Sequence, residues 1–152
     1  MKYPKHLALF FASTISFICF QGQNTTAFRI KEEIAQLDSL ATYIDRNENF
    51  KESNVNGRSQ LGIYEGVAYL NSSTKRIAKL DIFFDSTNLK VVLYCAEDSI
   101  LIYKENAHKY YYINNCYYNQ IGIKEISEKT LSRIPEYEKI FKGLAYLFLS
   151  DD

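Results

Sequence analysis

Hydrophobic residues between positions 28 and 46 recur with the spacing of one face of a helix. The spacing is three or four positions throughout, which is the pattern of an amphipathic α-helix. Such a helix has too few apolar residues to be stable alone, so the pattern predicts that its apolar side lies on another element. The residues concerned are Ile30, Ile34, Leu37, Ala41 and Ile44.

From residue 60 onwards the hydrophobic period becomes that of strands, whereas residues 47–59 are polar and are predicted to form a loop. Five later segments are rich in Ile, Val, Leu and Tyr and are separated by short polar pieces. Connections this short join antiparallel neighbours, because parallel strands need a long crossover. The pattern predicts a five-stranded antiparallel meander with strands at 60–71, 75–84, 89–95, 99–104 and 109–118.

The chain returns to helical spacing near its C-terminus. Pro135 suits the first turn of a helix, where its missing N–H is not needed, and apolar residues then recur on one side as far as Phe148. A shorter helical segment is predicted over 127–133, with Ser127 as its cap. An N-terminal helix, a meander and a C-terminal helix predict an α+β domain in which both helices pack on one face of the sheet.

Alternation along residues 77–84 divides their side chains between the two faces of the sheet. One face is entirely apolar and is predicted to meet the helices, and the other is mixed and is predicted to meet solvent or a partner. The apolar face carries Ala78, Leu80, Ile82 and Phe84, and the mixed face carries Ile77, Lys79, Asp81 and Phe83.

Residues 1–27 have the organisation of an export signal. Lys2 and Lys5 precede the uncharged and mostly apolar stretch 7–20. This stretch fits the roughly 7–15 residues of a signal-peptide core and is shorter than the roughly 20 residues of a membrane span. The segment predicts a leader that is cleaved after Gln21 or after Ala27, with an uncleaved anchor as the alternative. Residues 28–152 are then a single domain, located in the periplasm or secreted.

Composition narrows the classes of partner. The 152 residues include 18 Lys+Arg and 18 Asp+Glu, so the formal net charge is zero. Without a basic patch or a run of Lys and Arg, the chain lacks the electrostatic footprint of a protein that binds nucleic acid. Hydrophobic residues make up 47% of the chain, which predicts a folded core rather than disorder.

The residues of known catalytic and metal-binding motifs are scarce. After the leader only His108 remains, which excludes a metal site with two histidines, and the sequence lacks the phosphate-binding and nucleophile motifs. We therefore assign no catalytic residue, no metal and no cofactor. Carboxylates in or beside the strands leave one enzymatic alternative, a glycan-cleaving pair. These are Glu65, Asp81, Asp85, Glu97, Asp98 and Glu105.

Cys95 and Cys116 are the two cysteines that follow the leader. An even number of cysteines in an oxidising compartment is consistent with a disulfide. Against it, a five-stranded meander separates their strands by about 9–10 Å, whereas bridged Cα atoms lie within about 7 Å. A disulfide and two free thiols both remain open from the sequence.

Tyrosine is the most unusual feature of the composition. Thirteen tyrosines occur, and five of them fall between residues 110 and 118. Tyrosine offers a wide rigid surface with one hydroxyl group, which suits protein interfaces and sugar stacking, although its strand propensity alone also explains the enrichment. The residues we select as a candidate binding surface are Tyr94, Tyr103, Tyr110, Tyr112 and Tyr118.

The order of segments resembles that of small exported proteins of Bacteroidota that combine a helix with a β-meander and have no assigned function. The resemblance covers residues 28–118 and rests on the acidic-Gly pair Glu65-Gly66 and the segments EGVAYLN, KRIAKLDIFFD, LKVVLYC and SILIYK. These segments form the fold and are not catalytic, so the resemblance implies a bacterial envelope setting and no functional residues.

Together these features predict an exported, non-enzymatic protein of the bacterial cell envelope that binds a protein or another envelope component through an aromatic-rich sheet face. It is expected to meet a membrane only through its leader, if that is not cleaved. The alternatives are a small envelope enzyme that acts on glycans with Asp or Glu, and an inhibitor or immunity-like protein.

Overall fold

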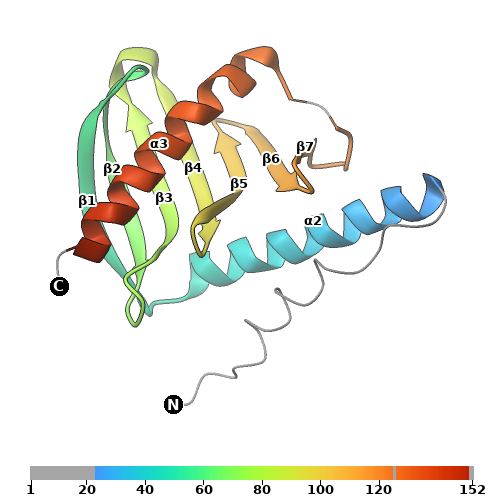
Figure 1. The fold of residues 1–152 in the computed structure, drawn as a ribbon, viewed down its shortest axis with the longest axis horizontal. Coiled ribbons are helices and arrows are strands. Elements are labelled where there is room, and N and C mark those ends of the chain that lie inside the picture. Colours follow the sequence, from blue (N-terminus) through green and yellow to red (C-terminus); the bar gives the residue numbers. More distant parts are fainter. Residues whose placement is uncertain (1–22, 125, 151–152) are drawn as a thin grey trace.

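The computed structural model describes residues 23–124 and 126–150, which form two α-helices and one seven-stranded antiparallel sheet (Figure 1). The fold is therefore α+β, as the sequence predicts, and residues 1–22 of the proposed leader 1–27 lie outside the described residues. The order of strands in the sheet is their order in the chain, a simple meander. The elements are α2 (Gln23–Arg46), β1 (Phe50–Ser59), β2 (Gly62–Asn71), β3 (Ile77–Phe84), η1 (Asp85–Thr87), β4 (Leu89–Ala96), β5 (Ser99–Glu105), β6 (His108–Ile113), β7 (Cys116–Asn119) and α3 (Glu128–Ser150).

Two strands correct the five-stranded prediction. The segment 47–59, predicted as a loop, contains β1, which pairs with β2 over its whole length. Val55 is the one fully buried side chain of β1, because this strand lies at the edge of the sheet. A strand with a single buried side chain has no hydrophobic alternation to detect.

The second correction concerns the predicted strand 109–118, which is the hairpin β6–β7. Its turn residues Asn114 and Asn115 have φ angles of 51° and 61°. Asparagine adopts positive φ more easily than most residues. Two such residues in succession form a tight hairpin turn whose backbone twist matches the right-handed twist of the flanking strands.

The C-terminal helix α3 is continuous from Glu128 to Ser150 and contains Pro135 in its interior, not in its first turn. The two predicted helical pieces are thus one helix. Ser127 caps it as predicted, because its Oγ accepts a hydrogen bond from the Thr130 N–H at 3.0 Å.

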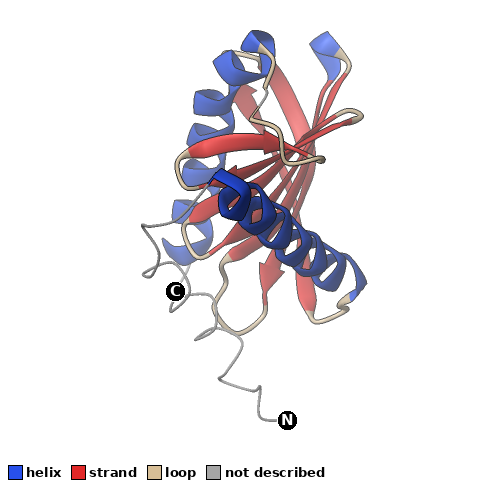
Figure 2. Ribbon diagram, turned by 90° about the vertical axis from the view of Figure 1, so that its right-hand side faces the viewer, coloured by secondary structure: helices blue, strands red, loops and turns tan. Residues whose placement is uncertain are grey.

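The two helices lie on opposite faces of the sheet, which corrects the prediction that both pack on one face. One core joins α3 to alternate side chains of β1 to β6, and a second core joins α2 to side chains of β4 to β6. Figure 2 shows the sheet between the two helices. We call the two sheet surfaces the α3 face and the α2 face.

The faces of β3 follow the predicted alternation except at the start of the strand. Leu80, Ile82 and Phe84 are buried on the α3 face, as predicted. Ile77 and Ala78 are exchanged: Ile77 belongs to the α3 core, and Ala78 packs against the α2 core. This reversal follows from a register irregularity between Tyr69 and Leu70 on β2, which shifts the pairing by one residue.

Candidate functional site

The five tyrosines selected from the sequence lie on both faces of the sheet. Tyr103 and Tyr110, which are paired across β5 and β6, are buried in the α3 core, and Tyr112 packs partly against it. Tyr94 is buried in the α2 core, and Tyr118 packs partly against that core. The structure thus divides these rings between two cores, and their role in binding stays a prediction.

On the α2 face, buried tyrosine hydroxyls attach the helix to the sheet. The Tyr94 hydroxyl donates to the Asp45 carboxylate at 2.8 Å, and the Tyr111 hydroxyl donates to the Asp38 carboxylate at 2.7 Å. Burial, followed by the adjacent carboxylate, raises the pKa of both phenols, so they stay neutral hydrogen-bond donors. Lys109 also contacts Asp38, which completes a polar anchor for α2.

On the α3 face, the corresponding anchor is buried more deeply. The Glu105 carboxylate accepts a hydrogen bond from the Tyr137 hydroxyl at 2.9 Å and forms an ion pair with Arg133, and both partners belong to α3. The Tyr103 hydroxyl donates to Glu138 at 3.3 Å. Burial is the main cause that raises the pKa of Tyr103 and of Tyr137. Glu105, a carboxylate considered for catalysis, therefore holds α3 on the sheet.

A pocket of about 330 Å³ opens on the α2 face where the C-terminal end of α2 stops. Its wall combines three lysines and two aspartates with one aromatic ring. The lining residues are Asp45, Lys79, Asp81, Lys90, Val92, Tyr94, Lys104 and Asn106.

Lys79 is held firmly in the wall of this pocket. Its Nζ lies 2.7 Å from the Asp45 carboxylate, 4.8 Å from the centre of the Tyr69 ring and 5.6 Å from the centre of the Tyr94 ring. An ammonium group held between two aromatic rings and a carboxylate has little freedom to move. The pocket therefore presents a pre-formed polar edge to any molecule that covers it.

Beyond the pocket, the α2 face is not covered by the helix. Ile63 is 59% exposed, and the Tyr69 and Phe83 side chains are half-buried although β2 and β3 are internal strands of the sheet. The cross-strand register places this set on one surface, which we call the open face. It comprises Ile63, Glu65, Val67, Tyr69, Lys79, Asp81, Phe83, Lys90 and Lys104.

The sequence contains part of the signal for this surface. Alternation assigns Lys79, Asp81 and Phe83 to a mixed face directed to solvent or a partner, and they lie on the open face. Tyr69 is not among the five tyrosines that the sequence indicates, because the number of tyrosines does not show which of them a helix will cover.

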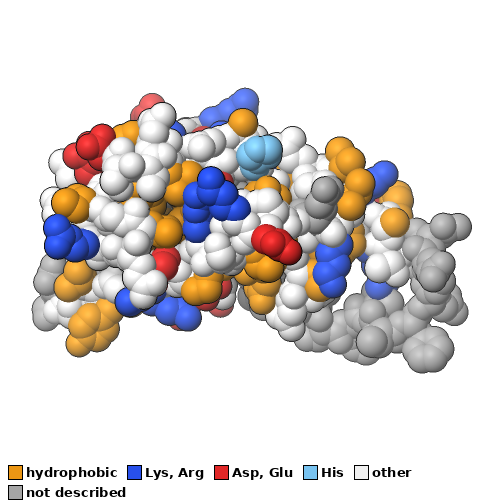
Figure 3. Space-filling view, turned by 90° about the horizontal axis from the view of Figure 1, so that it is seen from above, with side chains coloured by type: hydrophobic (Ala, Val, Ile, Leu, Met, Phe, Trp, Pro, Cys, Tyr) orange, Lys and Arg blue, Asp and Glu red, His pale blue; other side chains and the backbone are white. Residues whose placement is uncertain are grey.

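The two carboxylates of the pocket are each paired with a lysine. Asp45 and Asp81 line one pocket, but Asp45 lies 2.7 Å from Lys79 and Asp81 lies 3.4 Å from Lys90, so each contacts an ammonium group. His108, the one histidine in the described part of the chain, is exposed in the β5–β6 hairpin, and Figure 3 shows it in pale blue on the surface. Among the described residues no group of three metal-binding side chains comes together.

Cys95 and Cys116 are free thiols. Cys95 is buried in the α3 core, and burial raises its pKa. Cys116 is half-buried on β7 and pairs with Ile113, whose side chain belongs to the α2 core. The two sulfurs thus lie on opposite faces of the sheet with β5 and β6 between their strands, which is why they do not form a disulfide.

In comparisons with known proteins, no family model, curated protein or solved structure matches the chain. Within residues 23–124 and 126–150, neither helix is long and apolar enough to cross a membrane.

Proposed function

We propose that this chain is an exported, non-enzymatic binding protein of the bacterial cell envelope, and that a protein or another envelope component binds its open face. The observation that carries the proposal is the unequal covering of the sheet. α2 buries the β4–β6 part of its face and leaves aromatic and apolar side chains of β2 and β3 accessible.

The chemistry of the open face supports binding rather than catalysis. Tyr69 and Phe83 supply rigid aromatic surface, and lysines and carboxylates of both signs surround them. Aromatic groups that are half-buried before binding lose little conformational freedom when a partner covers them. The carboxylates of the pocket are engaged by lysines, which supports a role in recognition.

Export is supported by the sequence of residues 1–27. α2 begins at Gln23, so a cut after Gln21 leaves the helix whole, whereas a cut after Ala27 removes its first turn. The first buried side chain of α2 is Ile30, so both cuts preserve the α2 core. Fractionation of the producing cells, with N-terminal sequencing of the protein, tests this part. A chain with residues 1–20 intact in the cytoplasm would overturn it.

Binding is tested by affinity capture from an envelope extract with three forms of the protein. The wild type is compared with the double variant Tyr69→Ala/Phe83→Ala on the open face and with Tyr146→Ala, which removes an exposed ring from α3 as a matched control. Circular dichroism checks that all three are folded.

We expect the wild type and Tyr146→Ala to retain the same component in stoichiometric amount, and the double variant to lose it. Retention by the double variant, or loss with the control, would contradict the assignment of the open face. Cleavage of a retained glycan by the wild type would instead favour an enzyme.

A further inference from the structure

β1 forms one edge of the sheet, and within the described part of the chain its outer side pairs with no strand. Successive strand residues direct their backbone N–H and C=O groups alternately to the two sides. The Lys90 carbonyl accepts a hydrogen bond from the Asn106 N–H at 2.8 Å, so Lys90 points to β5 and Val91 points to β3. Val91 pairs with Ile82, which therefore points back to β4.

The register transfers this alternation to β1. Asp81 points to β2, where it pairs with Val67. The next residue of β2, Gly66, then points to β1, where it pairs with Val55. Val55 thus uses its backbone groups on β2, and the residues on either side of it use theirs on the outer edge. Between Lys51 and Ser59, the outward backbone groups belong to Glu52, Asn54, Asn56 and Arg58.

These four residues are arranged so that a second β1 strand matches them. If two β1 strands run antiparallel with their Val55 residues opposite each other, Glu52 lies opposite Arg58 of the second copy. Asn54 then lies opposite Asn56 of the second copy. Each of these residues has outward backbone groups, so every pair is of the hydrogen-bonded kind.

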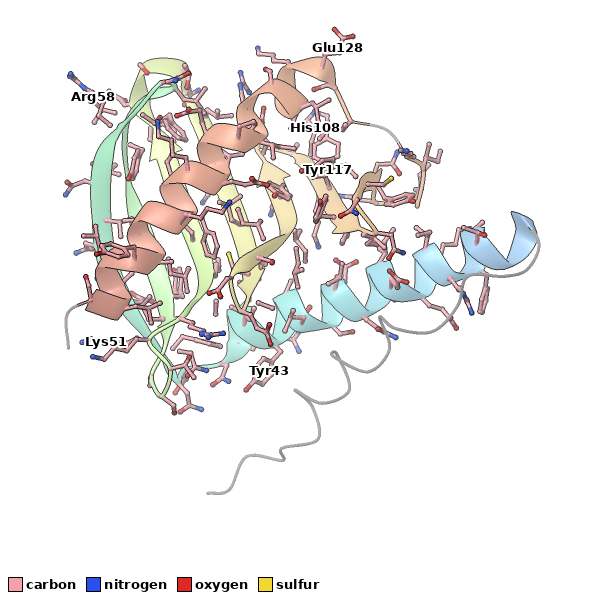
Figure 4. The ribbon with its side chains drawn as sticks, viewed as in Figure 1. Tyr43, Lys51, Arg58, His108, Tyr117 and Glu128 are labelled. Atoms are coloured by element: carbon pink, nitrogen blue, oxygen red, sulfur yellow. The ribbon has the colours of Figure 1, made fainter. Side chains whose placement is uncertain are left out.

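The charges favour this register over its neighbours. Neither Glu52 nor Arg58 forms an ion pair with any residue that the structure describes. Figure 4 shows Arg58 near the upper end of β1, directed away from the sheet. A shift by two residues in either direction keeps the backbone pairing but separates both ion pairs, and directly opposed charges of opposite sign stabilise cross-strand pairing.

We propose that a second copy of this chain pairs with β1 about a twofold axis at Val55, so that the two sheets become one continuous sheet. This proposal does not require the proposed function, because it rests on the outer backbone edge of β1. The side chains of Glu52 and Arg58 lie on the α2 face, beside Tyr69 and Ile63 of the open face. A symmetric pairing of this kind closes the edge and prevents further addition of strands there.

Charge reversal tests the pairing, with sedimentation equilibrium of the purified protein over a concentration series as the measurement. The wild type is expected to be a dimer. Glu52→Arg alone, or Arg58→Glu alone, places like charges opposite each other twice and is expected to weaken dimerisation by about tenfold or more. Glu97→Arg, in the β4–β5 turn, is the matched control and is expected to leave the dimer unchanged.

Two combinations of these changes, a double variant and a mixture of the single variants, make the test specific for the register. The double variant Glu52→Arg/Arg58→Glu carries both changes in one chain, so that opposite charges again face each other between the two copies. It is expected to dimerise like the wild type. An equimolar mixture of the two single variants is expected to form a heterodimer, since all the introduced and native charges then complement each other.

Proline substitution tests the backbone pairing separately. Asn54→Pro removes an N–H that points outward, so the β1–β2 pairing survives while the dimer is lost. A wild-type protein that stays monomeric at the highest concentrations would overturn the proposal. So would a dimer that survives both Asn54→Pro and the single charge reversals.

Discussion

The α3 face and the α2 face are built from alternate residues of the same strands, yet one is closed and the other is half open. The two helices are almost equal in length, 23 and 24 residues. α3 buries side chains from β1 to β6, whereas the side chains buried under α2 come from β4 to β6. The difference therefore lies in which strands each helix covers, and not in the amount of helix.

This contrast separates stability from binding. On β3, the side chains directed to α3 are apolar and fully buried, whereas Lys79, Asp81 and Phe83 on the other side remain partly accessible. A helix that covered the whole α2 face would bury Lys79 and Asp81 at a substantial cost in desolvation. The half-open arrangement keeps these charges in water and leaves a surface for a partner.

The largest expected effect compares two neighbouring phenylalanines of β3. Phe84 is fully buried under α3, whereas Phe83 is half-exposed on the open face. Phe84→Ala is expected to lower the free energy of unfolding by about 3–5 kcal/mol, and Phe83→Ala by about 1 kcal/mol. Urea unfolding followed by circular dichroism measures both. Equal losses would mean that the α2 face is closed in solution.

The next comparison sets a buried ion pair against an exposed one. Arg133→Met leaves Glu105 buried without its cationic partner and is expected to cost about 3 kcal/mol. Lys90→Met breaks the 3.4 Å pair with Asp81, in which Lys90 is largely exposed, and is expected to cost less than about 1 kcal/mol. The same unfolding experiment distinguishes them, and a larger loss for Lys90→Met would reverse the assignment of stability to the α3 face.

Alternation along the chain predicted the strands β2 to β5 because buried residues recur at alternate positions along most of each strand. β1 could not be predicted, since it lies at the edge of the sheet, where most of its polar side chains stay in contact with solvent and no hydrophobic alternation is needed. A signal for the two-sided sheet is present in β4, where five consecutive residues from Val91 to Cys95 are all buried. A continuous apolar run of this kind is typical of a strand covered on both faces.

The open face was predictable only in part, and for a related physical reason. Alternation indicates that Lys79 and Phe83 share a side, but it does not indicate how far a helix extends over that side. The position of α2 depends on hydrogen bonds between residues distant in the chain, such as Tyr94 with Asp45. Pairings of this kind leave no pattern in a single sequence.

A smaller effect tests a property that the two faces share. Burial raises the pKa of Tyr137 on the α3 face and of Tyr94 on the α2 face above the ordinary value of 10.0. The folded state thus favours the neutral phenol, so stability is unaffected below pH 10 and is lost as the pH rises above it.

Each of these tyrosines contributes at most about 1.4 kcal/mol per pH unit to that loss. Tyr137→Phe and Tyr94→Phe are both expected to flatten the decline in the free energy of unfolding above pH 10, measured by urea titration at several pH values. A flattening with only one variant would show that the other hydroxyl is accessible to water.

The smallest effect concerns the two thiols, whose modification distinguishes the faces without destabilising the protein. Burial in the α3 core raises the pKa of Cys95, so at neutral pH it carries almost no reactive thiolate and iodoacetamide cannot reach it. Cys116, on the half-buried strand β7, is expected to react in the folded protein, and both thiols are expected to react in urea.

Peptide mapping by mass spectrometry identifies the modified residue. The control is Cys116→Ser, which is expected to show no labelling among the described residues until the protein unfolds. Labelling of Cys95 at the rate of Cys116 in the native state would mean that α3 opens frequently, and the closed face would then be the more mobile of the two.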